Sequence, residues 1–255
     1  MKRPYKILLI LTGALVLTVV VIAANVSRSR SQVRGVEADI RYGSTPRLVE
    51  GQTVVDSVLA ACPQLPTMLV REVDRDEVAV AAEQVSYLKD VSVAVSVSGR
   101  VVVKAVQRRP VARLFYGGRE YYFDSEGAVM PASKVGECNV LVAGGDFTEP
   151  LRVDSLNSQM LSLVKVANYL DKEKKYGRLI DQIYVERDGD VMMAPKIGDH
   201  VIELGDAENL DEKFSNLLAF YQKGMPRAGW NTYSRISLKF RGQVVCTKEK
   251  EINQK

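Results

Sequence analysis

The chain has 255 residues, of which 46% are apolar and 26% charged, proportions that exclude a disordered, collagen-like or coiled-coil protein. Its length allows one or two modest domains, each able to bury a core, and excludes a large multidomain machine. The formal net charge is +4, but Lys2, Arg3 and Lys6 supply three of those charges, so the body is nearly neutral and lacks the electrostatic footprint of a nucleic-acid-binding protein.

The first predicted element is a membrane anchor at residues 7–26, which follows a short stub of residues 1–6. Eighteen uncharged residues run from Ile7 to Ala24, and as a helix they would reach roughly 27 Å, close to the hydrocarbon thickness of a bilayer. The alternative is a cleaved signal peptide, with which the small residues Ala23 and Ala24 are compatible; the length of the run favours the anchor. No second stretch of this kind follows.

The charges that flank this segment do not orient it. Arg28, Arg30 and Arg34 follow the segment and balance the three cations that precede it. Only the very short N-terminal flank and the large C-terminal body suggest that the body is translocated. Residues 27–32 are predicted to be a polar juxtamembrane linker.

A small α+β unit is predicted at residues 33–109, with the order β-α-α-β-β and two helices on one face of a three-stranded sheet. Alternating valines predict its hairpin, and Asp74 is the expected N-cap of its second helix. Its expected elements are a strand at Val33–Tyr42, helices at Thr53–Ala61 and Asp74–Tyr87, and hairpin strands that start at Val91, turn at Ser98-Gly99 and end at Gln107.

A larger β-rich domain with helices packed on its sheet is predicted at residues 110–247, followed by a charged tail at residues 248–255. Asp206 is the expected cap of its second helix, which Gly224 and Pro226 end. The expected elements are a hairpin that turns at Gly117-Gly118, strands near 138–145, 179–187, 191–194 and 200–204, helices at 156–170 and 210–221, and closing strands at Ile236–Phe240 and Gln243–Cys246.

The three cysteines, Cys62, Cys138 and Cys246, are widely spaced and form no CxxC motif. An odd count allows at most one disulfide and leaves a free thiol. A periplasmic location would permit a disulfide, but the favoured interpretation is that all three are small buried hydrophobic residues.

No catalytic constellation is recognisable in the sequence. His200 is the single histidine, so no second histidine can join it in a metal site or a catalytic triad. The pairs Asp124 with Glu126 and Asp188 with Asp190 flank glycines and are interpreted as turn residues. Arg108 and Arg109, which could bind phosphate, precede a proline and more often mark a solvated strand end. We therefore predict a protein that is not an enzyme and has no cofactor.

Several motifs together resemble the FtsQ (DivIB) family of bacterial cell-division proteins. The residues Arg108 to Ala112 match the family's Arg-Arg-Pro-Val-Ala segment, and Tyr122 to Gly127 match its aromatic, Asp-x-x-Gly turn. Two positions differ from the pattern: Gln107 stands where an acidic residue is common, and Ser98 stands where a proline is frequent. Downstream, residues 197–221 resemble the family's strand and helix, and residues 234–246 resemble its closing strand pair.

The resemblance implies a membrane-proximal POTRA domain followed by the family's β domain, with the N-terminus cytoplasmic and the body periplasmic. It implies a scaffold at the division septum, in the inner membrane, that binds FtsB and FtsL and acts through them on the peptidoglycan synthase FtsW–FtsI. An edge strand can provide such a site by β-augmentation, because its free N–H and C=O groups can pair with a partner strand.

The family's FtsB-binding strand matches Tyr233 to Phe240. The alternation of a strand would put Arg235, Ser237 and Lys239 on one face and Ile236, Leu238 and Phe240 on the other. Trp230 precedes this strand, and the sequence leaves open whether it is an interface anchor or a core side chain.

Two other classes of function remain as alternatives. One is a POTRA-type periplasmic adaptor or chaperone for envelope protein assembly, which would bind extended chains at a sheet edge. The other is a secreted hydrolase, which would need a cleaved N-terminus and a catalytic group that the sequence does not reveal.

Overall fold

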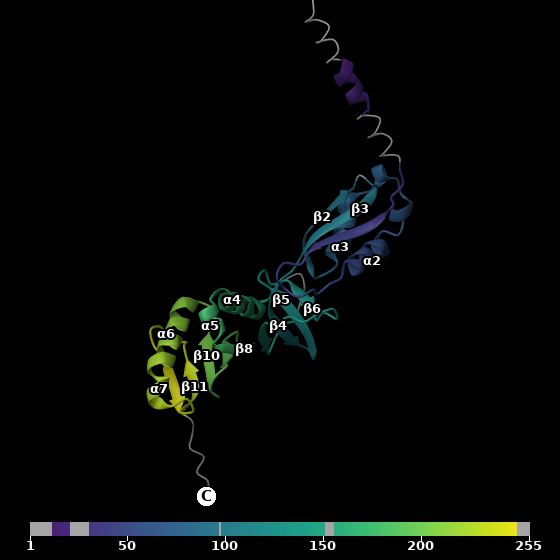
Figure 1. Ribbon diagram of the computed structural model, residues 1–255. Coiled ribbons are helices and arrows are strands. Elements are labelled where there is room, and N and C mark those ends of the chain that lie inside the picture. Colours follow the sequence, from purple (N-terminus) through teal and green to yellow (C-terminus); the bar gives the residue numbers. More distant parts are fainter. Residues whose placement is uncertain (1–11, 21–30, 97, 151–155, 249–255) are drawn as a thin grey trace, which may run out of the picture. The chain divides into compact units, whose positions relative to one another are not determined.

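The computed structural model describes residues 12–20, 31–96, 98–150 and 156–248. The chain forms two compact units, residues 1–108 and 109–255, called here the N-terminal and C-terminal units (Figure 1). The stub, most of the predicted anchor and nearly all of the charged tail lie outside the described ranges. Within those ranges, no helix combines the length and apolar character needed to cross a membrane.

The N-terminal unit is built on a three-stranded sheet with the order β1-β3-β2 (Figure 1). Strand β1 (Gly35–Arg41) runs parallel to β3 (Arg100–Gln107), which pairs antiparallel with β2 (Leu88–Val95). The helices α2 (Gly51–Ala61) and α3 (Arg75–Glu83) come between β1 and β2 in the chain, together with the 3₁₀ segments Leu65–Thr67 and Val70–Glu72. This is the predicted β-α-α-β-β order.

Both helices pack on one face of this sheet. Alternate residues of β3, Val101 and Val103, are fully buried, and so are Val54 and Val58 of α2 and Ala82 of α3. The period of two in the strand and the helical spacing of the apolar residues thus meet in one core, as the sequence pattern predicts.

The start of α3 agrees with the prediction and its end does not. The Asp74 carboxylate accepts hydrogen bonds from the amides of Asp76 and Glu77 at 2.9 and 3.2 Å, as an N-cap does. The helix ends at Glu83, four residues before the predicted end. Tight turns follow, in which the amide of Leu88 donates to the carbonyl of Val85, and they deliver the buried Leu88 to the start of β2.

Gln107, the residue that departs from the acidic family pattern, is 4% exposed and uses both ends of its amide. Its Oε1 accepts from the amide of Leu48 at 2.7 Å, and its Nε2 donates to the carbonyl of Pro46 at 2.9 Å and to Thr45 at 3.2 Å. A carboxylate could accept the first bond but could not donate the others. The neutral side chain therefore ties the loop before α2 to the last residue of β3.

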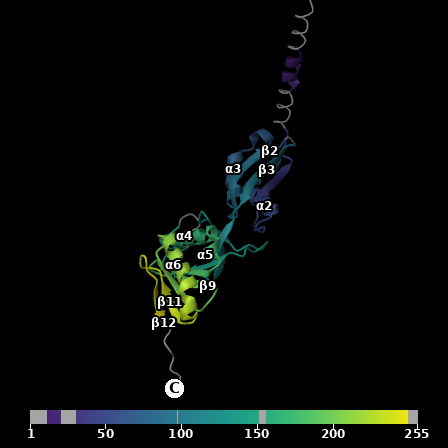
Figure 2. The same ribbon diagram turned by 60° about the vertical axis from the view of Figure 1, so that its left-hand side comes forward.

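The C-terminal unit contains a nine-stranded mixed sheet, and the fold is α+β (Figures 1 and 2). The strand order is β12-β11-β10-β9-β8-β7-β4-β5-β6, with parallel pairing at β4–β7, β7–β8 and β10–β11. The strands are β4 (Pro110–Tyr116), β5 (Arg119–Asp124), β6 (Val129–Pro131), β7 (Leu141–Gly145), β8 (Ile180–Val185), β9 (Val191–Pro195), β10 (Val201–Gly205), β11 (Tyr233–Ser237) and β12 (Val245–Lys248).

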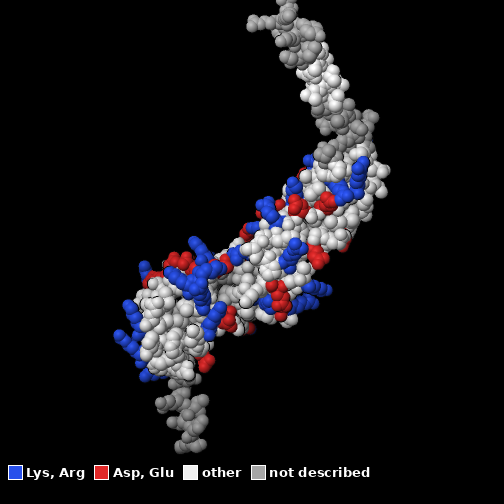
Figure 3. Space-filling model, viewed as in Figure 1, with Lys and Arg blue, Asp and Glu red and all other residues white. Residues whose placement is uncertain are grey.

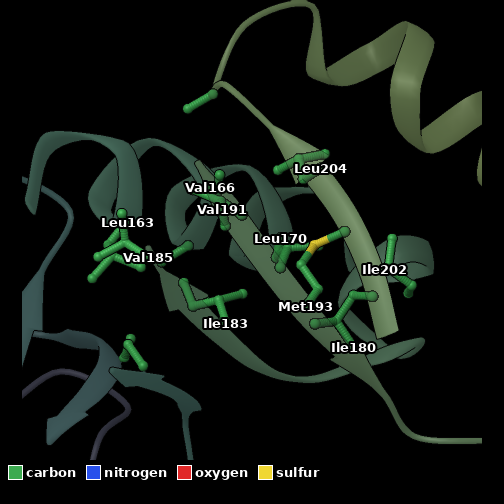
Figure 4. Close-up of a cluster of buried hydrophobic side chains, with 14 of the residues drawn as sticks. Leu163, Val166, Leu170, Ile180, Ile183, Val185, Val191, Met193, Ile202 and Leu204 are labelled. Atoms are coloured by element: carbon green, nitrogen blue, oxygen red, sulfur yellow. The ribbon is translucent and has the colours of Figure 1, made fainter. Parts of the chain in front are cut away.

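Two long helices make the crossovers that parallel strands require. Helix α4 (Ser158–Lys172), with the short α5 (Lys174–Gly177), connects β7 to β8, and α6 (Leu210–Lys223), with the short α7 (Met225–Ala228), connects β10 to β11. Figure 4 shows the resulting core, in which Leu163, Val166 and Leu170 of α4 pack among side chains of β8, β9 and β10. The strand side chains in this core are Ile180, Ile183, Val185, Val191, Met193, Ile202 and Leu204.

The predicted cap of α6 is wrong. The N-cap is Asn209, in the left-handed region at φ 51°, which asparagine tolerates better than most residues. Asp206 instead accepts hydrogen bonds from the amide of Glu208 at 3.3 Å and from Lys213 Nζ at 2.5 Å. The Lys213 hydrogen bond, more than the opposing burial, keeps the pKa of Asp206 below its usual value.

Candidate functional site

The open edge of the C-terminal sheet is the candidate site. Strand β12 stands at the end of the strand order and pairs only with β11 among the described residues. Its side chains Val245, Thr247 and Lys248 are exposed, and Val245 is 42% exposed. The strand thus presents an unpaired row of backbone groups beside an apolar side chain.

The expectation that Tyr233–Phe240 itself forms the free edge is wrong. Strand β11 ends at Ser237 and is paired on both sides, in parallel with β10 and antiparallel with β12. The register places Ser237 opposite Glu203 on one side and opposite Val245 on the other. The sequence motif therefore identifies the penultimate strand, and the open edge lies one strand further along the chain.

The predicted alternation of faces holds only for part of this segment. Arg235 is exposed and Ile236 is fully buried, but Ser237 and Leu238 are both buried, at 6% and 2% exposure. The chain leaves the regular strand after Ser237, although the amide of Leu238 still donates to the carbonyl of Glu203 at 2.8 Å. The two faces of an ideal strand are therefore no guide beyond this point.

Two ion pairs hold the segment against its neighbours. Arg235 bonds to Glu203 across the parallel pair, and Lys239 bonds to Asp190. Burial raises the pKa of Glu203, but the hydrogen bond from Arg235 and nearby charges outweigh it, so the net pKa lies below the usual value. The hydrogen bond to Asp190 likewise raises the pKa of Lys239. Both predicted cations on this segment are thus already paired with carboxylates of the same unit.

Phe240 is a second exposed apolar residue of this region, at 56% exposure. It lines a small groove of about 90 Å³ between the first turns of α6 and the loop that joins β11 to β12. The carboxylate of Glu212 accepts from the amide of Gly242 at 3.0 Å and fastens that loop to α6. The groove therefore lies between α6 and the loop that leads into β12.

Trp230 is half-buried and packs with its edge toward Tyr221, with 5.4 Å between ring centroids. Tyr221 in turn contacts His200, whose Nε2 lies 2.7 Å from the phenolic oxygen. His200 is 2% exposed, and burial lowers the pKa of its imidazole, with Asp199 opposing that shift, so the ring is neutral near pH 7. Trp230 thus packs against Tyr221 of α6, three residues before β11 begins.

The other polar candidates have structural partners. The Asp124 carboxylate accepts from the amides of Glu126 and Ala128, both at 2.9 Å. The Asp188 carboxylate accepts from the backbone amide of Asp190 at 3.1 Å, so both Asp124 and Asp188 are turn residues. Arg109 bonds to Asp171 of α4, and that hydrogen bond holds the pKa of Asp171 below its usual value against the effect of burial. Cys62, Cys138 and Cys246 are all free thiols.

The region that holds this edge also matches a known protein family. Residues 109–247 match the model of the family described as FtsQ/DivIB, C-terminal related, which is more than half of the chain. The chain belongs to this family. A comparison with curated proteins finds no match.

Membership in the FtsQ/DivIB family gives the chain a role in cell division and partners among division proteins. The matched range holds the whole nine-stranded sheet up to Thr247, including nearly all of the open edge. On the face that Figure 3 shows, lysine and arginine side chains lie among aspartate and glutamate side chains, so neither sign forms an extended field there. Such a surface suits protein partners better than a polyanion.

Proposed function

We propose that the chain is a non-enzymatic, membrane-anchored scaffold of the bacterial division complex that binds FtsB and FtsL at β12. The observation that carries the proposal is an edge strand, β12, whose outer side has no partner strand among the described residues. It exposes a valine and lies inside the region that matches the FtsQ/DivIB family. A partner strand added to β12 would satisfy backbone groups that the fold leaves unpaired.

The residues expected from the sequence then have two different tasks. Phe240 would contact the partner directly, because it is exposed beside the groove at the end of the edge. Tyr233, Arg235, Ile236 and Ser237 would act through the ladder, because each pairs with a residue of β12. Leu238, Lys239 and Trp230 would hold this ladder in place by burial, by the Asp190 ion pair and by packing on Tyr221.

The N-terminal unit is proposed to be a POTRA domain that follows an anchor at residues 7–26. Its β-α-α-β-β order and its single-sided helix layer support this assignment. The body would then be periplasmic, at the septum, where it would link early division proteins to FtsW–FtsI through FtsB and FtsL.

Two neighbouring proline substitutions test the edge. In an antiparallel ladder, the backbone groups of adjacent residues point to opposite sides, so of Cys246 and Thr247 one faces β11 and the other faces the open edge. Cys246→Pro and Thr247→Pro should therefore differ. Proline at the position whose N–H faces β11 should destabilise the unit. Proline at the position whose N–H faces the open edge should leave thermal unfolding unchanged and abolish capture of FtsB in a pull-down, because an edge strand tolerates proline only where its N–H is free.

Cys246→Val and Thr247→Val are the matched controls, because each keeps its backbone donor and should retain FtsB. Retained capture by the well-folded proline variant would show that β12 is not the binding strand. A fluorescent fusion separates the proposal from the POTRA-type adaptor: a ring at mid-cell supports division, and a uniform envelope signal supports the adaptor.

A further inference from the structure

The orientation proposed above leaves a charge pattern unexplained. Arg34 belongs to a run of three arginines, with Arg28 and Arg30, on the flank that would be translocated, where positive charge is unfavourable for topology. Arg28 and Arg30 lie outside the described residues, whereas Arg34 and its neighbours lie within them.

Three segments come together where the chain enters the N-terminal unit. The amide of Val33 donates to the carbonyl of Met68 at 3.0 Å, and the amide of Val70 donates to the carbonyl of Ser31 at 2.9 Å. The amide of Arg34 donates to the carbonyl of Gly99 at 3.0 Å. Residues 31–34, 68–72 and 98–100 therefore form one hydrogen-bonded patch, called here the N-terminal clasp.

Each segment of the clasp contributes one exposed arginine: Arg34, Arg71 and Arg100. The stem of Arg34 lies along the turn at Gly99, where φ is +84° and an added Cβ would sit 3.7 Å from Arg34 Cγ. Two carboxylates contact these arginines: Glu72 pairs with Arg71 at 3.5 Å and also accepts from the amide of Leu69 at 3.3 Å, and Glu37 of β1 pairs with Arg100. The three arginines and these two carboxylates leave the clasp a cationic surface with a net charge of +1.

The length of chain before the clasp limits its distance from the membrane. If the anchor ends at residue 26, the five residues 27–31 can span at most about 17 Å, even when fully extended. The clasp must then lie within reach of the headgroup layer. Arg41, by contrast, lies at the other end of the same sheet: it pairs with Val106, whereas Arg100 pairs with Gly35 at the clasp end.

We propose that the N-terminal clasp binds the headgroups of anionic phospholipids and so sets the orientation of the N-terminal unit on the membrane. A guanidinium group can bind a phosphate through two parallel hydrogen bonds, and its charge near an anionic surface is attractive within a Debye length. The half-buried Leu69 and Val70 directly precede Arg71 in the clasp and suit the apolar boundary below the phosphates. This inference rests on the proposed membrane anchor.

The test uses the full chain in nanodiscs made of phosphatidylcholine alone or of phosphatidylcholine with phosphatidylglycerol. Backbone hydrogen exchange in peptides that cover the clasp should be slower in the phosphatidylglycerol discs, and high salt should remove the difference. The combined substitutions Arg34→Gln, Arg71→Gln and Arg100→Gln should abolish it, while exchange in Val101–Ala105 stays slow and reports an intact fold.

The matched control removes three charges from elsewhere on the same sheet, with Arg41→Gln, Lys89→Gln and Lys104→Gln, and should keep the lipid-dependent protection. Equal exchange in the two lipids, or protection that survives the clasp substitutions, would overturn the proposal. The clasp variant should still capture FtsB, so the division scaffold is tested separately. A mature chain shortened by cleavage near Ala24, detected by its mass, would remove the anchor and with it this inference.

Discussion

The two edge strands of the nine-stranded sheet differ in burial and in proline content. At one end, β6 has three residues, its Val129 and Met130 are buried, and it finishes at Pro131. At the other end, β12 has no proline and exposes Val245. Short edges and prolines are ways in which proteins prevent edge-to-edge pairing. One end of the sheet is therefore closed, and the other is available to a partner.

The closed end gains its burial from a loop that folds back over it. Tyr122 of β5 is opposite Met130, and its hydroxyl accepts from the buried amide of Cys138 at 3.2 Å. Arg113 reaches the same hydroxyl at 3.2 Å and the carbonyl of Cys138 at 3.4 Å. The open end is instead held by ion pairs that are partly solvated. Stability should therefore depend more on the closed end, and partner binding on the open one.

The largest effect is expected from Met130→Ala. Met130 is fully buried, so the truncation leaves a cavity and should lower the free energy of unfolding by about 2–5 kcal/mol. Chemical denaturation measures it. Val245→Ala removes a comparable apolar group at the open end and should change the free energy by well under half as much; equal losses would remove the contrast between the ends.

A smaller effect is expected from Tyr122→Phe. The change keeps the ring but leaves the buried amide of Cys138 without its acceptor, which costs about 1–3 kcal/mol. Thermal unfolding measures the loss. Tyr121→Phe is the control, because Tyr121 lies on the opposite face of β5, across from Leu114 and Pro131, and should be near neutral. A neutral Tyr122→Phe would mean that the loop does not depend on this bond.

The closed end also marks a limit of what the sequence could predict. The hairpin strands β4 and β5 and their glycine turn follow from local signals, and both are found near the predicted residues. Strand β6 has only three residues, too few for a detectable period, and it was not predicted. The burial of Tyr122 depends on a loop that is 16 residues away in sequence, which no local pattern encodes.

At the open end, the sequence identified the closing segments but not their order in space. The residues from Ile236 to Leu238 are all buried because the chain leaves the regular strand after Ser237, so the alternation of a strand does not extend to Leu238. Which strands pair depends on contacts between residues far apart in the sequence, so β12 could not be recognised as the edge strand. Gln107 illustrates the same limit: its departure from the family pattern is explained only by the Pro46 carbonyl to which it donates.

The ion pair at the open end predicts a modest dependence on pH. The folded-state pKa of Glu203 is lowered, so its stabilisation is fully present above its unfolded pKa near 4.5 and is lost as the pH falls through the folded value. Glu203→Gln should flatten the stability curve below about pH 5, with a difference of about 1 kcal/mol at neutral pH, since Arg235 is half-exposed. Denaturation at several pH values measures this, and an unchanged slope would contradict it.

The smallest effect on folding, and the sharpest contrast between the ends, is expected from Val245→Lys. Val245 is exposed on an edge strand, so the change should alter the free energy of unfolding by only about 0.5 kcal/mol. Lys248 already stands at the last position of β12, and a second lysine at its first position would guard both ends of the edge against strand pairing, so capture of FtsB should be lost. Val245→Thr, which keeps the branched β-carbon without a charge, should retain it. Loss of binding without loss of stability would assign partner recognition to the open edge; a lysine variant that still captured FtsB would mean that exposure at β12 serves no partner.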